Sequence, residues 1–350
     1  TFVGHISCTG KLQENETFLL DGKVEALDAE LDFGSKISFN ARGEILITNY
    51  IEMAEQQLDL SILPVIFPEL DGISLHVNAK TTGDYTYYRN SGKGSMEITL
   101  SDGSLSWPEK QLEADSIHFT FSLPNFPALV SDSQVIRFKN FKYGKIEVES
   151  GRFGYRMYSP TVWFIDNTTL NWCGGKIRGE SMRLSPENRR TRITLHADRL
   201  KLSELLHQIG IGTDSGGTGT ISGTIPAIIS KEEGIVFRDA YLYSTPGEEG
   251  RIELIPSQTV LDSTEGSIES ALAVDALKNF SYSWVKIGLN TQDETLTAKF
   301  EMDGKPADEL YYSVGKDGIV RSKNPVKFKG IKLDVSFNLP LNETLFLFTE

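Results

Sequence analysis

Alternation of apolar and polar residues is the feature that most constrains the fold of this chain. Ile37 and Phe39 lie between polar residues, and the alternation resumes at Ile45 after Gly43-Glu44. Successive side chains of a strand point to opposite faces of a sheet, so a period of two predicts one apolar and one polar face. The Gly43-Glu44 break predicts a hairpin.

The same alternation recurs about every dozen residues along the chain. It returns in the segments 96–100, 117–121, 146–157, 193–195, 235–237, 296–302 and 331–339. Asp-Gly pairs, which tolerate the backbone of tight turns, separate many of these segments. Helical patterns are confined to 51–58, 202–209 and 268–277. The sequence therefore predicts a mainly β protein with a long, twisted antiparallel sheet and a few short helices.

Charge and cysteine content exclude several classes of protein. The chain has 350 residues and a formal net charge of -13, which argues against a nucleic-acid partner and predicts repulsion from anionic membrane surfaces. Cys8 and Cys173 are too few for a disulfide scaffold or a four-cysteine zinc site, and whether they pair is left open. The chain begins at Thr1, has no signal-like segment, and is expected to be part of a longer protein.

A glycine-rich segment predicts the domain boundary. Residues 210–219 contain five glycines and no large apolar residue after Ile211. We expect one domain of repeated strands over residues 1–209 and a second, mixing strands with one helix, over 210–350.

Catalytic and metal-binding patterns are weak. Thr213-Asp214-Ser215-Gly216-Gly217 matches the sequence around a trypsin-like nucleophile, but none of the five histidines lies in a recognisable partner motif. Glu232-Glu233 and Glu248-Glu249 are adjacent carboxylates in polar segments, which are usually solvated and not glycosidase pairs. The sequence predicts no catalytic residue, no metal site and no cofactor.

The segment after Gly210 carries a resemblance to a known family. Gly217 to Pro226 reads Gly-Thr-Gly-Thr-Ile-Ser-Gly-Thr-Ile-Pro, and 234–240 and Ser244-Thr245-Pro246-Gly247 follow it. Together with 276–282 and 296–304 this resembles the C-terminal domain of YdbH-like proteins, while 196–206 is similar to the strand-to-helix pattern of AsmA-like and TamB-like proteins. The same domain has been labelled a dicarboxylate-transport domain, although no site for two carboxylates is visible.

The resemblance implies a bridge-like lipid-transfer protein of the bacterial periplasm. Its sheet would curl into a U-shaped apolar groove for phospholipid acyl chains, with membranes at either end of the parent protein and an inner-membrane anchor upstream of Thr1. The residues expected to line the groove are the inward apolar positions of the best-alternating strands. These are Phe33, Ile37, Phe39, Phe119, Phe121, Phe153, Leu296, Phe300, Met302, Leu333, Val335 and Phe337.

Two other classes of function fit the same alternation. A structural or carbohydrate-binding β-solenoid would use the apolar face as its own core, with Trp107, Trp163, Trp172 or Trp284 as a stacking surface for sugars. An enzyme on a β scaffold is the third class. An apolar face that stays partly uncovered favours the groove, and a fully covered one favours the solenoid.

Overall fold

A large open β-sheet dominates the protein. The structure is a computed structural model, and it describes residues 4–13, 16–26, 29–40, 42–60, 71–213, 216–230, 234–263, 267–292, 295–315 and 318–340. Antiparallel pairing joins 21 strands in one sheet, and β21 and β22 form a separate two-stranded sheet. The predicted mainly β, antiparallel fold with few short helices is confirmed.

The chain divides into two compact units that do not follow the expected boundary at residue 210. Unit 1 contains 1–141, 150–167 and 183–187, and unit 2 contains the remaining residues. The helix and the strand that flank residue 210 both belong to unit 2. The division of this chain into domains 1–209 and 210–350 stays a prediction.

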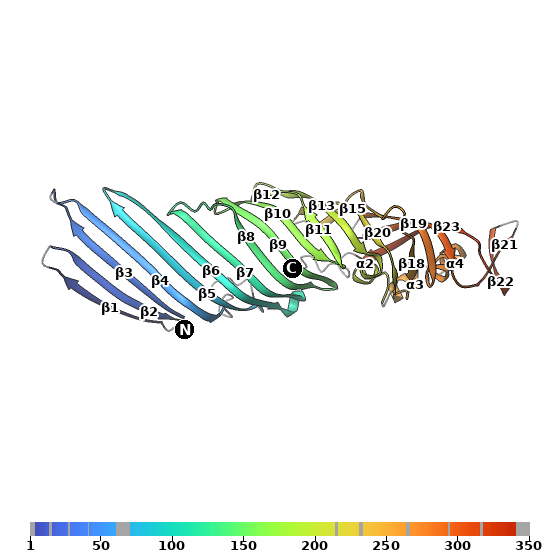
Figure 1. Ribbon diagram of the computed structural model, residues 1–350, viewed down its shortest axis with the longest axis horizontal. Helices are drawn as coiled ribbons and strands as arrows, with labels where there is room; N and C mark the ends of the chain where they lie inside the picture. The colour runs from blue at the N-terminus through green and yellow to red at the C-terminus, as the bar shows by residue number, and fades with distance from the viewer. Residues whose placement is uncertain are drawn as a thin grey trace. The chain divides into compact units, whose positions relative to one another are not determined.

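Unit 1 is a meander of long strands that pair with their sequence neighbours, as Figure 1 shows for the strands coloured blue to green. Its strands are β1 (Gly4–Leu12), β2 (Phe18–Ala26), β3 (Ala29–Phe39), β4 (Ile45–Asp59), β5 (Ser74–Tyr88), β6 (Ser91–Trp107), β7 (Leu112–Phe126) and most of β8 (Gln134–Tyr143). The strands β9 (Ile146–Ser159), β10 (Val162–Trp172) and β12 (Met182–Leu184) contribute residues to both units. Among the described residues of this unit the only helical element is the short 3-10 turn η2 (Pro108–Lys110).

The predicted hairpin at Gly43 is confirmed, and the helix predicted for 51–58 is wrong. Gly43 has a φ of +74°, and Phe39 pairs with Ile45 beyond it. Residues 51–58 instead lie in β4, where the register with β5 shifts between Met53 and Gln56. Cross-strand pairing on both sides of β4 outweighs the helical propensity of its Ala, Glu and Gln residues.

The described residues of unit 2 combine shorter strands with three helices. The strands are β11 (Gly175–Gly179), β13 (Arg190–Lys201), β14 (Gly216–Thr218), β15 (Thr220–Ser230), β16 (Gly234–Phe237), β17 (Ala240–Ser244), β18 (Gly250–Glu253), β19 (Phe280–Gln292), β20 (Thr295–Pro306), β21 (Leu310–Gly315), β22 (Gly318–Val326) and β23 (Ile331–Pro340). The helices are α2 (Leu202–Gln208), α3 (Gln258–Ser263) and α4 (Ile268–Leu277). The helices predicted near 202–209 and 268–277 are thus confirmed.

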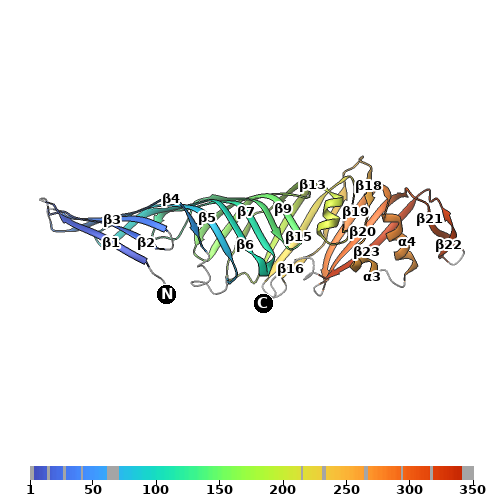
Figure 2. The same ribbon diagram turned by 90° about the horizontal axis from the view of Figure 1, so that it is seen from below.

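The helices of unit 2 cover the apolar side of its strands. Figure 2 shows α3 and α4 beside β19, β20 and β23, and the buried side chains of α2 and α4 belong to the same core cluster as Phe280, Ile287 and Phe300. Ser267 caps α4 by accepting a hydrogen bond from the Ser270 backbone. None of the described helices is long and apolar enough to cross a membrane.

Candidate functional site: the open apolar face of unit 1

One face of β1–β7 is apolar from strand to strand, and we call it the open face. Directly paired residues of antiparallel strands point to the same face, so the register defines it. A single row across the sheet runs from Phe33 in β3 to Ile51, Gly83, Met96 and Leu123 in the four strands that follow. Residues without polar side chains thus form a band across five strands, with a gap in side-chain bulk at Gly83.

The opposite face of the same strands is polar. The neighbouring row of paired residues runs from Asp32 through Glu52, Thr82 and Glu97 to Ser122. Because its side chains are polar, this face can stay in contact with water at little cost in free energy. The alternation also means that the apolar side must be covered by protein or by an apolar ligand, because soluble proteins rarely leave large apolar patches exposed.

No described helix of unit 1 covers the open face. Several of its side chains reach solvent near the start of the sheet, where Phe18 is 37% exposed, Ile45 46% and Phe39 51%, while Phe33 and Ile37 are partly buried. Further along, β7 carries Phe119 and Phe121, whose rings stack, and Phe119 also stacks on Tyr155 of β9 at a centroid distance of 5.5 Å. The face therefore offers partly exposed aliphatic and aromatic side chains to a ligand.

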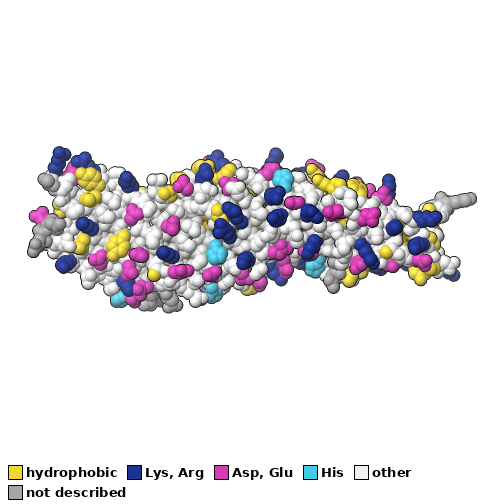
Figure 3. Space-filling view, in the orientation of Figure 1, with side chains coloured by type: hydrophobic (Ala, Val, Ile, Leu, Met, Phe, Trp, Pro, Cys, Tyr) yellow, Lys and Arg dark blue, Asp and Glu magenta, His cyan; other side chains and the backbone are white. Residues whose placement is uncertain are grey.

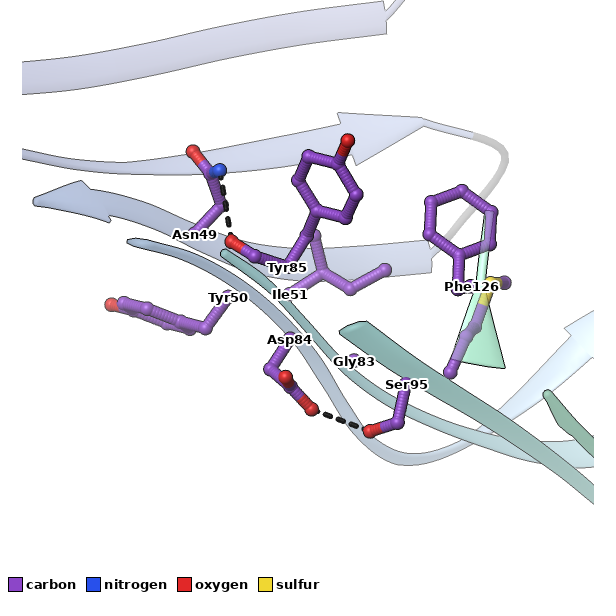
Figure 4. A pocket seen from close by; sticks show the side chains of 9 residues that line it. Asn49, Tyr50, Ile51, Gly83, Asp84, Tyr85, Ser95 and Phe126 are labelled. Atoms are coloured by element: carbon purple, nitrogen blue, oxygen red, sulfur yellow. Dashed lines mark hydrogen bonds between the residues drawn. The ribbon is translucent and has the colours of Figure 1, made fainter. Parts of the chain in front are cut away.

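A shallow pocket of about 230 Å³ lies in the middle of this face (Figure 4). Ile51, Met96 and Phe126 line it, and Gly83, which pairs with both Ile51 and Met96, leaves space between them. Tyr85 and Phe126 form one wall, with their rings edge to face at a centroid distance of 5.9 Å. Asn49 shares this face and donates a hydrogen bond to the Tyr85 carbonyl at 3.1 Å.

The pocket depends on close approach of β5 and β6. A Cβ on Gly94 would lie 1.9 Å from the Asp84 carbonyl oxygen, a clash with backbone and not with a movable side chain. On the polar face the same strands are joined by the hydrogen bond from Ser95 to Asp84.

We expect Gly94→Ala to destabilise unit 1 by about 1–3 kcal/mol, because the two strands must separate to admit the methyl group. Gly288→Ala in β19 is a suitable control, since no atom lies closer than 4.0 Å to a Cβ there and its φ is not in the left-handed region. Urea denaturation followed by circular dichroism measures both. A Gly94→Ala variant as stable as wild type would show that this close approach is not required.

The expected groove-lining residues fall into two sets. Phe33, Ile37, Phe39, Phe119, Phe121 and Phe153 all belong to unit 1 and are partly buried or exposed. Leu296, Phe300, Met302, Leu333, Val335 and Phe337 belong to unit 2 and are 1–8% exposed. The first five of the unit 1 set lie on the open face by register. Phe153 is two residues from Tyr155 on β9 and so shares its face.

The unit 2 set packs into a closed core, so an exposed groove there is not supported. Phe300 meets Phe337 edge to face at 5.5 Å, and helical side chains such as Leu206 and Leu277 cover both. The space left among these residues is about 10 Å³, roughly the size that admits one water molecule. We therefore restrict the proposed lining to unit 1. Leu339, the last alternating residue, has a side chain outside the described part.

Catalytic alternatives find little support. His76 Nδ1 lies 3.4 Å from Ser74 Oγ, and its Nε2 lies 3.5 Å from Asp59, which superficially resembles a Ser-His-Asp triad. However, the imidazole and carboxylate are 48% and 54% exposed, whereas a triad carboxylate is buried and firmly hydrogen-bonded to its histidine. Asp214 and Ser215 of the trypsin-like motif, and Glu232-Glu233, lie outside the described residues.

The described residues also give little support to a metal site, a disulfide or a sugar-binding surface. The described residues include no group of three or more metal-ligating side chains. Cys8 and Cys173 are both free thiols, and burial raises the pKa of Cys173 well above its ordinary value. The indole N–H groups of Trp163 and Trp172 donate hydrogen bonds to the Pro160 carbonyl and to Gln208.

Comparison with known proteins decides the family. A family model described as "YdbH-like: Intermembrane phospholipid transport protein YdbH" matches residues 76–311, about two thirds of the 350 residues. The chain belongs to the YdbH-like family. The resemblance predicted from 196–304 is confirmed, and the match extends it upstream to β5. Comparisons with curated proteins and with solved structures gave no match.

Membership in this family sets the general function. YdbH-like proteins are an intermembrane phospholipid-transport family and not an enzyme class, which is consistent with a place in the bacterial envelope. The label of dicarboxylate transport finds no support in the match. One residue of the pocket in this YdbH-like chain was missed by the sequence prediction. Ile51 lies in the segment predicted to be a helix. The spacing of Ile45, Ile47, Ile51 and Met53 nevertheless follows the period of a strand, and this signal could have placed Ile51 on the apolar face.

Proposed function

We propose that the open face of unit 1 is a groove surface that holds phospholipid acyl chains during transfer between the inner and outer membranes. The observation that carries this proposal is the apolar row from β3 to β7, uncovered by any described helix, in a member of a phospholipid-transport family. The headgroup would stay in water outside the groove. No bond is made or broken, and the lipid slides.

Elementary energetics support such a surface. Burying one acyl methylene contributes about 0.8 kcal/mol, so half of an acyl chain gives several kcal/mol before the entropy cost of binding. This interaction needs no particular polar partner, and it acts on any acyl chain. A surface of this kind favours movement along the sheet, because successive positions offer similar contacts.

The location and the flanking partners belong to the same proposal. We expect the protein in the periplasm, attached to the inner membrane by a segment upstream of Thr1 and reaching a membrane at each end of the parent protein.

The first test is native mass spectrometry of the chain purified from bacteria, with lipid extraction of the same sample. We expect bound phospholipid that remains after dilution, at a stoichiometry set by the length of the open face. A protein free of lipid even after incubation with phospholipid vesicles would contradict the proposal and favour a structural role for the apolar face.

A further inference from the structure

A short segment of unit 2 reverses the acidic character of the chain. Residues 316–332 contain six basic residues and one acidic residue, a formal charge of +5 in a chain whose total is -13. The basic residues are Lys316, Arg321, Lys323, Lys327, Lys329 and Lys332. The net charge therefore hides a local basic cluster, and repulsion from anionic surfaces, expected from the net charge, does not apply to this segment.

The cluster lies on and after the hairpin β21–β22. The hairpin projects beyond α4 in Figures 1 and 2 and forms its own two-stranded sheet. Its base is anchored, because Leu310 and Tyr312 are buried and the Tyr312 hydroxyl donates a hydrogen bond to Asp275 of α4 at 2.8 Å. Burial and this carboxylate raise the pKa of Tyr312 to about 12, so the hydroxyl keeps its proton.

The outer part of the hairpin exposes apolar side chains beside the basic ones. Val314 is 74% exposed, Tyr311 59% and Val320 48%. In Figure 3, dark-blue and yellow side chains occur together where Figure 1 places β21 and β22. The register pairs Val314 with Ile319 and Val320 with Ser313, so the two valines lie on opposite faces near the end of the hairpin, and exposed apolar side chains are available on both of its faces.

The loop after β22 presents its charges outward. Phe328 packs against the core of unit 2, while its neighbours Lys327 and Lys329 are both exposed. Arg321, Lys323 and Lys332 are exposed too, and none of the five described basic side chains forms an ion pair with another described residue. The basic charge is thus available to an external anion.

We propose that β21, β22 and residues 327–332, which include the start of β23, form a docking site for the surface of an anionic phospholipid bilayer. Exposed Val and Tyr side chains beside several lysines match the interface of such a bilayer, where apolar groups insert at the level of the headgroups and cations pair with phosphates. The site is separate from the open face, lies in the other unit, and does not depend on acyl-chain binding there.

Vesicle flotation of the intact chain tests the proposal. We expect binding to phosphatidylcholine vesicles that contain 30% phosphatidylglycerol, and weak binding to pure phosphatidylcholine. Each basic residue near an anionic surface contributes about fivefold to the partition coefficient, so Lys323→Gln with Lys327→Gln and Lys329→Gln should lower it about a hundredfold. High salt should weaken wild-type binding in the same direction.

A matched variant distinguishes the effect of removing lysines from the basic cluster from the effect of lowering the positive charge of the chain elsewhere. Lys36→Gln with Lys80→Gln and Lys93→Gln removes the same charge from the polar face of unit 1, where these lysines have no ion pair with a described residue, and should leave binding within about threefold of wild type. Val314→Ser with Val320→Ser should weaken binding without changing its salt dependence. Equal loss in both lysine variants, or equal binding to neutral vesicles, would overturn the proposal. Loss of acyl-chain loading with intact flotation would instead affect only the groove.

Discussion

Replacing Ile47 and Ile98 by aspartate should remove at least nine tenths of the phospholipid that the chain carries. Both side chains lie on the open face, Ile47 opposite Ile37 and Ile98 opposite Phe121. A carboxylate there either keeps its water, which interrupts the apolar surface that the acyl chain contacts, or loses its water at a cost of at least 1–3 kcal/mol. Since 1.4 kcal/mol corresponds to a factor of ten, one such site is enough for a tenfold loss. Native mass spectrometry of the purified variant measures it.

The register supplies a control for this variant in the adjacent residues. Thr48 and Thr99 occupy the same two strands but point to the polar face, opposite Lys36 and Lys80. Thr48→Asp with Thr99→Asp therefore adds the same charge one residue away along the same two strands, but on the polar face. We expect lipid loading within about twofold of wild type. Similar thermal unfolding of both variants would exclude a folding defect. Equal lipid loss in the two variants would contradict a one-sided groove.

Local sequence predicted the sheet well because alternation is a local property. The period of two over Ile37–Ile47 and Leu296–Met302 gives both the strand and its two faces, and the Gly43 turn gives the hairpin. The same reasoning failed for 51–58, where a register shift after Met53 breaks the period and composition favours a helix. Pairing with strands on both sides decided this segment, and such long-range pairing is not visible in a local window.

The division of apolar faces into open and closed could not be predicted from alternation. Phe39 and Phe337 have similar surroundings in the sequence, yet one is 51% exposed and the other 1%. The difference comes from α2, α3 and α4, which pack on the strands of unit 2, whereas no described helix packs on those of unit 1. A strand pattern shows that one side is apolar, but the elements that cover it come from distant parts of the chain.

Phe300→Ala should cost unit 2 about 3–5 kcal/mol of unfolding free energy, the usual range for emptying a fully buried phenylalanine site. Phe300 is 2% exposed, contacts Phe337 edge to face, and lies under Leu206 and Leu277, so the cavity has little room to collapse. Phe39→Ala makes the same chemical change on the open face and should cost less than about 1 kcal/mol, since half of that ring is already in water. Hydrogen exchange of the β20 and β3 amides reports each unit separately.

Polar substitution extends the same comparison to the expected lining residues. Phe300→Asp with Phe337→Asp would bury two carboxylates without partners and should unfold unit 2 outright. Phe33→Asp with Phe39→Asp should leave unit 1 folded while reducing its bound lipid, because both side chains reach solvent in β3. If the unit 2 variant folds and loses lipid instead, its apolar face is an accessible surface, and the six unit 2 residues return to the proposed lining. If it unfolds and the β3 variant does not, the closed core belongs to unit 2 and the open face to unit 1.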